Sequence, residues 1–119
     1  MSEVYIPDNL FGGHIMPKVD DSLVVASGQG VLARGTLLGL VTATGKAKVV
    51  SKSASDGSEK VYAVLAENVD TTNGDVLAPV YLTGEFNENA LTVAEGDTVA
   101  DHKASARAVG IFIKSTLSV

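Results

Sequence analysis

The sequence predicts a mainly β, compact, barrel-like single domain with one or two short helices and an extended N-terminal arm. A chain of 119 residues is the usual length of one domain with a modest core. Twelve glycines, with frequent Val and Thr, favour short strands joined by tight turns. Aromatic residues make up only 5% of the chain and Trp is absent, so Val, Leu, Ile and Ala must form the core.

Residues 1–21 differ from the rest and form the predicted arm, followed by a β-rich domain over residues 22–119. Breakers such as Pro7 and Pro17 interrupt this segment, and it shows no helical periodicity and little strand alternation. Two alternatives remain open, packing on its own domain and docking on a partner. The candidate contact residues of the arm are its large apolar side chains: Val4, Tyr5, Ile6, Leu10 and Phe11.

The first half of the domain reads as strands separated by turns. Residues 23–26 form a short apolar run, and residues 27–30 form a turn. Residues 31–41 are strand-like, with Gly35 and Gly39 marking a bend, a bulge or a close backbone approach.

The next segment turns at Gly45 and continues as a strand over residues 47–50. Residues 52–59 then form a polar loop with Asp56 and Gly57 at its tip.

Residues 61–91 are predicted to contain two buried strands and a short helix. Residues 62–66 are apolar on both faces, so both sides of that strand should be covered. The polar turn over 71–75 can hold positive φ at Asn73 and Gly74. Pro79 is expected to open the next strand, where its missing N–H costs nothing.

Local signals then predict the helices and the final strand. Gly84 is expected to end the strand, and Asn87 to cap a helical turn that begins at Glu88. Asp97 or Thr98 can cap a helix over residues 100–108, with Gly110 just beyond its end. Residues 111–113 and Leu117 form the last strand.

Charge and composition exclude several function classes. The net charge of −5 opposes binding to nucleic acid, and no cationic cluster serves an anionic membrane. The absence of Cys rules out disulfides and thiolate metal sites. No signal peptide or spanning segment is expected, so the protein should remain in the cytoplasm where it is made.

The residues suited to catalysis do not form a recognisable pattern, and we expect no enzyme activity, no cofactor, no metal and no catalytic residue. His14 and His102 could form a metal or acid–base pair, but two surface histidines are the better interpretation. Ser27 lacks the surroundings of a nucleophile elbow and reads as a turn residue.

The carboxylate side chains likewise form no recognisable catalytic or calcium-binding pattern. The pairs Asp20–Asp21 and Glu85–Glu88 lack the spacing of a calcium loop and read as turn or helix-terminus residues. The Asn and Asp side chains at 68, 70, 73 and 75 lack a closing Glu, so a turn is again favoured.

Several blocks of the chain resemble the lambda-type head decoration proteins of tailed bacteriophages. They are YAVLAENVDTT (62–72), APVYLTGEFNENAL (78–91), GVLARGTLLGLVTATGK (30–46) and AVGIFIKSTL (108–117). They occur in the family's order and cover most of the chain from about Gly30 onward.

This resemblance implies a β-clip fold and a capsid decoration (cement) function. Family members bind the outside of the expanded head as homotrimers at local threefold positions, and their N-terminal segment contacts the shell. The implied partner is the major capsid protein, and the implied location is the outer surface of the virion, after synthesis in the host cytoplasm. The competing class, a virion-surface carbohydrate-binding or adhesin module, is weakened by the few aromatic residues.

Overall fold

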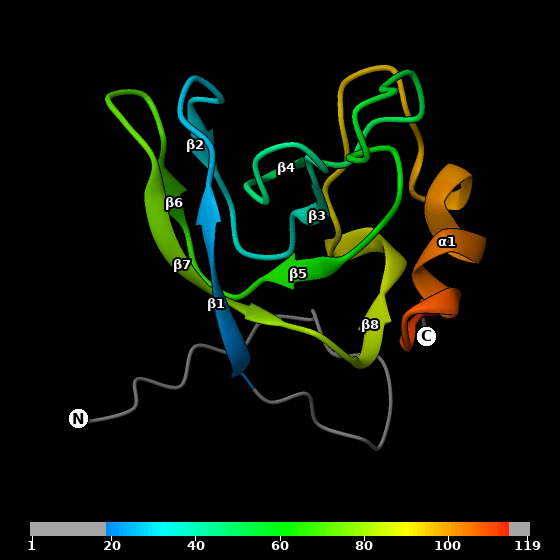
Figure 1. The fold of residues 1–119 in the computed structure, drawn as a ribbon. Coiled ribbons are helices and arrows are strands. Elements are labelled where there is room, and N and C mark those ends of the chain that lie inside the picture. The colour runs from blue at the N-terminus through cyan, green and yellow to red at the C-terminus, as the bar shows by residue number, and fades with distance from the viewer. Residues whose placement is uncertain (1–18, 115–119) are drawn as a thin grey trace, which may run out of the picture.

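The computed structural model describes residues 19–114, which form a small closed β-barrel with a smaller layer beside it (Figure 1). Strands make up 37% and helices 14% of the structure, so the predicted mainly β class is confirmed. The barrel strands follow one another around the wall in the order β1 (Val19–Val25), β4 (Ala47–Val49), β3 (Leu37–Leu40), β5 (Ala63–Leu65) and β7 (Val76–Tyr81).

Strand β1 closes the barrel. It runs antiparallel to β7 from the pair Val19↔Tyr81 to the pair Val25↔Val76, with a register shift between Val19 and Asp21. Its last residue also pairs in parallel with Ala47 of β4. The strand begins at Val19, before the predicted domain boundary at residue 22 and the predicted apolar run over 23–26, because its register with β7 extends back that far.

Two short sheets flank the barrel. Strands β2 (Val31–Leu32) and β6 (Val69–Asp70) form an antiparallel pair. Strands β8 (Gly84–Asn87) and β9 (Ile111–Lys114) pair in parallel, although they lie far apart in the sequence. In Figure 1, β6 and β7 lie on one side of the molecule and the helix α1 (Lys103–Ala108) lies on the other.

The C-terminal helical segment follows its predicted signals. The 3-10 helix η2 (Val99–His102) runs directly into α1. Thr98 caps η2 in a capping box, in which its hydroxyl accepts from the Asp101 N–H and the Asp101 carboxylate accepts from the Thr98 N–H. Gly110, with φ of 87°, follows α1 as predicted.

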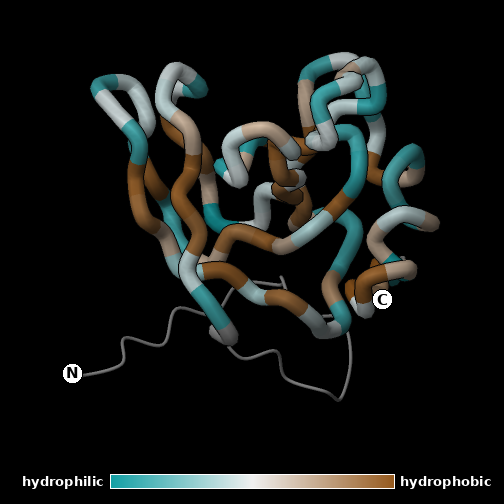
Figure 2. The backbone as a smooth tube through the Cα atoms, in the orientation of Figure 1, coloured by the Kyte–Doolittle hydropathy of each residue, from teal (hydrophilic) through white to brown (hydrophobic). Residues whose placement is uncertain are grey.

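Two apolar clusters form the core. One fills the barrel and includes Leu38, Leu65 and Val80. The other lies between the barrel wall and the α1–β8–β9 layer and is centred on Phe86 and Ile111, both fully buried. The barrel strands are correspondingly apolar along much of their length (Figure 2). Burial of β5 on both faces is confirmed.

The glycine signals in residues 31–41 are confirmed. The chain bends at Gly35, where φ is 98°, and this bend separates β2 from β3. Gly39 marks a close approach, since a Cβ there would lie 2.6 Å from the carbonyl oxygens of Ser58 and Lys60. Gly45, with φ of 72°, turns the chain into β4 as expected.

Three local predictions over residues 73–84 are wrong. Neither Asn73 nor Gly74 has positive φ, because the β6–β7 connection is longer than a two-residue hairpin loop. Pro79 lies inside β7 and does not open it, because β7 starts at Val76 to match β1. Gly84 begins a strand, β8, that the sequence did not reveal, since its partner β9 lies near the end of the chain.

The short helix at Glu88 exists as the 3-10 helix η1 (Glu88–Ala90). Asn87 occupies its N-cap position, but its side chain makes no capping hydrogen bond. Asn87 is the last residue of β8, paired with Lys114, so the strand and not a side-chain cap sets the start of η1.

Candidate functional surfaces

The described residues contain no arrangement that could hold a metal ion, since no three His, Cys, Asp or Glu side chains gather among them. An open, shallow depression lies beside the 52–59 loop, lined among others by Thr42, Asp56 and Lys60. Among residues 19–114 there is no helix long and apolar enough to cross a membrane.

His102 is buried, so its interpretation as a surface histidine is wrong. Its side chain is 2% exposed, and its Nε2 lies 2.7 Å from the Asp97 Oδ2, whose side chain is 5% exposed. Asp97 Oδ2 also accepts from the Lys52 N–H at 2.8 Å. The hydrogen bond with His102 and then that with Lys52 lower the pKa of Asp97 below its ordinary value of 3.8.

This pair connects η2 to the strand-and-loop segment after β4, and it has no access for a substrate. Sequence reasoning placed His102 beside Asp101, its chain neighbour, whereas its partner lies at the preceding turn. The sequence features that could have predicted this contact were an Asp before a helical segment and a His inside that segment. His14 lies outside the described residues.

The acidic and amide side chains near the β6–β7 connection serve the fold. Asn68 Oδ1 accepts from the Arg34 N–H at 2.7 Å, and Asp70 Oδ1 accepts from the Thr72 N–H at 2.9 Å. Asp75 pairs with Lys46 at 2.7 Å and accepts from the Ser27 N–H, and these two contacts, the first more than the second, lower the pKa of Asp75. These contacts agree with the predicted turn.

Glu85 also has a local partner. It lies on β8 and forms an ion pair with Lys114 of β9 at 3.3 Å, across the parallel pair. Glu85 is thus a strand residue and not the solvated turn residue that the sequence suggested, because β8 was not foreseen.

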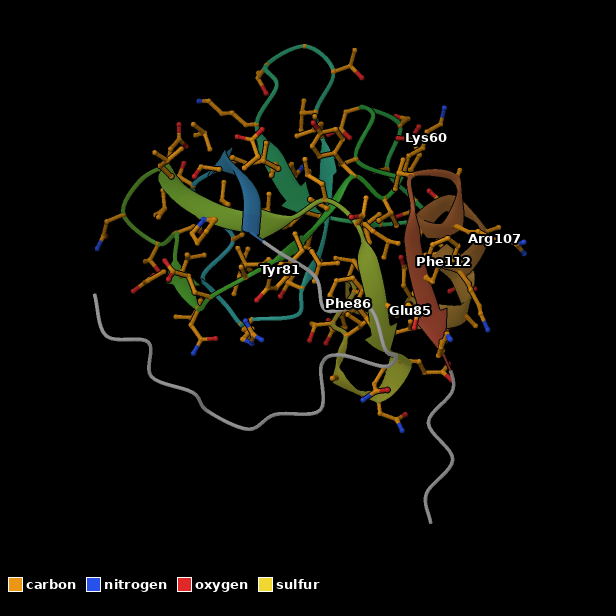
Figure 3. All side chains as sticks on the ribbon, turned by 90° about the horizontal axis from the view of Figure 1, so that it is seen from below. Lys60, Tyr81, Glu85, Phe86, Arg107 and Phe112 are labelled. Carbon is orange, nitrogen blue, oxygen red and sulfur yellow. The ribbon has the colours of Figure 1, made fainter. Side chains whose placement is uncertain are left out.

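The predicted capsid-contact residues Val4, Tyr5, Ile6, Leu10 and Phe11 lie outside the described residues. The structure shows what the arm is attached to. β1 begins at Val19, opposite Tyr81, and the Tyr81 hydroxyl accepts from Arg34 Nη1 at 2.7 Å. The Arg34 guanidinium also lies 5.5 Å from the centre of the Tyr81 ring. Tyr81 in turn packs beside Phe86 (Figure 3).

Six large apolar side chains of the described residues are exposed, and sequence reasoning missed them. They are Val24, Val31, Tyr62, Leu77, Val109 and Phe112. Val24 and Leu77 are cross-strand partners on the outside of the β1–β7 pair. On the opposite side, burial alternates along β9, with Ile111 and Ile113 inside and Phe112 outside, although the sequence is apolar at all three positions and gave no signal of this.

The family model of bacteriophage lambda head decoration protein D matches residues 7–111. The chain belongs to this family. A comparison with curated proteins gave no significant match. The family is one of structural phage capsid proteins, so this head decoration protein is a component of the virion capsid. The resemblance carried by the blocks from Gly30 onward is thereby confirmed, and the match extends it into the arm.

Proposed function

We propose that this head decoration protein binds the outside of the expanded phage head as a homotrimer at local threefold sites. There it stabilises the head against the pressure of packaged DNA. The observation that carries the proposal is the family match over residues 7–111, which includes most of the arm as well as the barrel.

Stabilisation follows from linkage. A protein that binds only the expanded lattice stabilises it by RT ln(1 + [L]/Kd), about 4 kcal/mol per site at a thousand-fold excess over Kd. Many sites on one head add to this effect. In a trimer, three arms engage together and binding gains from avidity.

The arm is the proposed contact with the major capsid protein. An extended segment can add to an exposed strand edge of the shell through main-chain hydrogen bonds. Its apolar side chains Val4, Tyr5, Ile6, Leu10 and Phe11 would fill pockets beside that edge.

The way in which the arm joins the barrel suits a segment that would carry force from the shell. β1 continues directly from the arm and is hydrogen-bonded to β7 from Val19 to Val25. Force on the arm therefore passes into the wall of the closed barrel and not into a loop. The net charge of −5 argues against nucleic acid or an anionic membrane as the partner.

The test is to mix the purified protein with expanded and with unexpanded empty heads of the parent phage and to count bound copies. Saturable binding to expanded heads alone, in multiples of three per site, is expected. Binding to neither form would reject the proposal. A glycan array run alongside would then test the adhesin alternative.

A further inference from the structure

The connection between β6 and β7 contains the only Asn–Gly pair of the sequence, Asn73–Gly74. Asn73 is exposed, and a Cβ added at Gly74 would meet nothing within 4 Å. In Figure 1 this connection forms a loop at the top of the view, away from the point where β1 begins. Gly74 does not have a positive φ, so the tight hairpin turn that often fixes such a pair is not formed here. The pair is open to water, with room around it.

The two ends of this loop are held, but the pair between them is not. The Thr71 hydroxyl donates at 2.8 Å to a carbonyl of the 27–30 turn, and the Asp75 carboxylate accepts at 2.9 Å from an N–H of the same turn. Among the described residues, neither the side-chain amide of Asn73 nor the backbone N–H of Gly74 has a hydrogen-bond partner. No contact there holds these two groups away from each other.

This freedom has a chemical consequence, because the two groups can react with each other. The Gly74 backbone nitrogen attacks the side-chain carbonyl carbon of Asn73. A C–N bond forms, and the side-chain nitrogen leaves as ammonia with the proton that the Gly74 nitrogen loses. Water then opens the resulting cyclic imide at either carbonyl, which gives an ordinary aspartate or an isoaspartate whose main chain runs through the side-chain carbon. Glycine favours the attack, since a Cβ would crowd the attacking nitrogen.

The other place where Asn or Asp precedes Gly, Asp56–Gly57 in the loop after β4, has the opposite arrangement. The Gly57 N–H, which would be the attacking group, donates to Glu59 Oε1 at 2.9 Å. Asp56 Oδ1 accepts from the Ser58 N–H at 3.0 Å and from the Ser58 hydroxyl at 2.6 Å. Both groups of this pair are engaged elsewhere, so the fold protects Asp56 and leaves Asn73 unprotected.

We propose that Asn73 is a site of spontaneous modification, at which the folded protein converts asparagine into aspartate or isoaspartate without an enzyme. The aspartate product places a new negative charge between Asp70 and Asp75, in a chain whose net charge is already −5. The isoaspartate product lengthens the main chain of a loop whose ends are held at Thr71 and Asp75. A sample of this protein should therefore become, with time, a mixture of original and more acidic chains.

The test follows the full chain in a mildly alkaline buffer, which speeds the loss of the proton from the attacking nitrogen. Anion exchange separates the more acidic chains, and tandem mass spectrometry of proteolytic peptides locates the modified residue. Labelling with protein isoaspartate methyltransferase identifies isoaspartate. We expect modification at Asn73 to be at least about tenfold faster than at Asn68 and Asn89, which precede Val and Ala.

A comparison of the folded chain with the urea-unfolded chain tests the structural argument. At Asn73 the folded and unfolded rates should differ by less than about tenfold, because the fold holds neither reacting group. At Asp56 the folded rate should lie at least about tenfold below the unfolded rate. Glu59→Ala, which frees the Gly57 N–H, should raise the folded rate at Asp56 and leave the rate at Asn73 unchanged.

Two variants at the pair itself identify the reaction. Asn73→Gln keeps an amide but requires a larger ring, so the modification should disappear. Gly74→Ala has room for its Cβ, so the fold and Tm should be kept, while the rate at Asn73 should fall by about tenfold. Equal rates in Gly74→Ala and the parent chain would overturn the assigned attack. A folded rate at Asn73 more than about tenfold below the unfolded rate would show that the loop is held, and would overturn the proposal.

Discussion

The guanidinium of Arg34 occupies the hydrogen-bonding position that Pro79 leaves vacant in the barrel wall. The β5–β7 register places Ala66 opposite Pro79, and the Ala66 N–H donates to the Pro79 carbonyl at 3.0 Å. The reciprocal bond is impossible because proline has no N–H. Arg34 Nη1 donates to the Ala66 carbonyl instead, at 2.8 Å. A side chain from the β2–β3 bend therefore makes an interior proline tolerable in β7.

Replacing Arg34 tests this relationship. Arg34→Met keeps the apolar stem but leaves the Ala66 carbonyl without its donor, in a residue that is only 7% exposed. We expect a loss of about 1–3 kcal/mol in the free energy of unfolding, measured by urea denaturation.

A double-mutant cycle with Pro79→Ala identifies the cause, because alanine restores the backbone donor. Arg34→Met should cost less in the Pro79→Ala background, by at least about 0.5 kcal/mol. Equal costs in both backgrounds would show that the lost contact with Tyr81 dominates. Tyr81→Phe, which removes only the hydroxyl, is the control.

Two glycines give opposite predictions. Gly39→Ala places a Cβ 2.6 Å from two backbone carbonyl oxygens and 2.8 Å from the Ser58 Cα, so the 52–59 loop must shift. We expect a loss of roughly 1–3 kcal/mol in the free energy of unfolding.

Gly74→Ala is the matched control. It meets nothing within 4 Å, and its φ is not positive, so it should be neutral or stabilise by up to about 1 kcal/mol through the unfolded state. Similar denaturation midpoints for the two variants would contradict the close approach at Gly39.

The Asp97–His102 contact predicts a dependence of stability on acid. The folded protein lowers the pKa of Asp97 below 3.8, so this stabilisation is fully present above that value. It is lost as the pH falls through the lower, folded pKa. The Tm should therefore drop below about pH 4.

Asp97→Asn should have a lower Tm at neutral pH and a shallower fall in acid. The control is Asp70→Asn, because the pKa of Asp70 is lowered by contacts with Thr72 alone, at an exposed turn. A parallel Tm-against-pH curve for Asp97→Asn and the unmodified protein would exclude Asp97 as a source of the acid sensitivity.

Deletion of residues 2–16 tests the arm. Because β1 begins at Val19, the deletion leaves every strand of the barrel in place, and the circular dichroism spectrum and Tm should be preserved. Copies bound per expanded head should fall to background if the arm makes the contact. Undiminished binding would assign the contact to the barrel.

Much of the local structure was predictable because its signals lie within a few residues. The Thr98 cap needs only Asp101 three residues later, and Gly110 needs only the end of α1 before it. The burial of β5 on both faces could be predicted because the side chains on both of its faces are apolar. The resemblance in residues 30–117 likewise depended on sequence order alone.

The features that sequence reasoning missed depend on partners far along the chain. β8 becomes a strand because β9 lies beside it, and Pro79 sits inside β7 because β1 sets the register. His102 is buried because Asp97 and the backbone of Lys52 meet it there. No local pattern specifies such pairings, since loop closure brings them together only when the barrel forms.

The sequence by itself therefore determined the mainly β class, the turns, the helix signals and the family of this capsid protein. The tertiary structure alone decided how the barrel closes and which side chains remain outside it. Alternation of polar and apolar residues along a strand shows that one face of the strand is exposed. It does not show which exposed faces of other strands lie on the same side of the molecule. The exposed side chains of Val24, Val31 and Leu77 share one side of the molecule because folding gathers β1, β2, β6 and β7 there, whereas α1 and β9 lie on the other side.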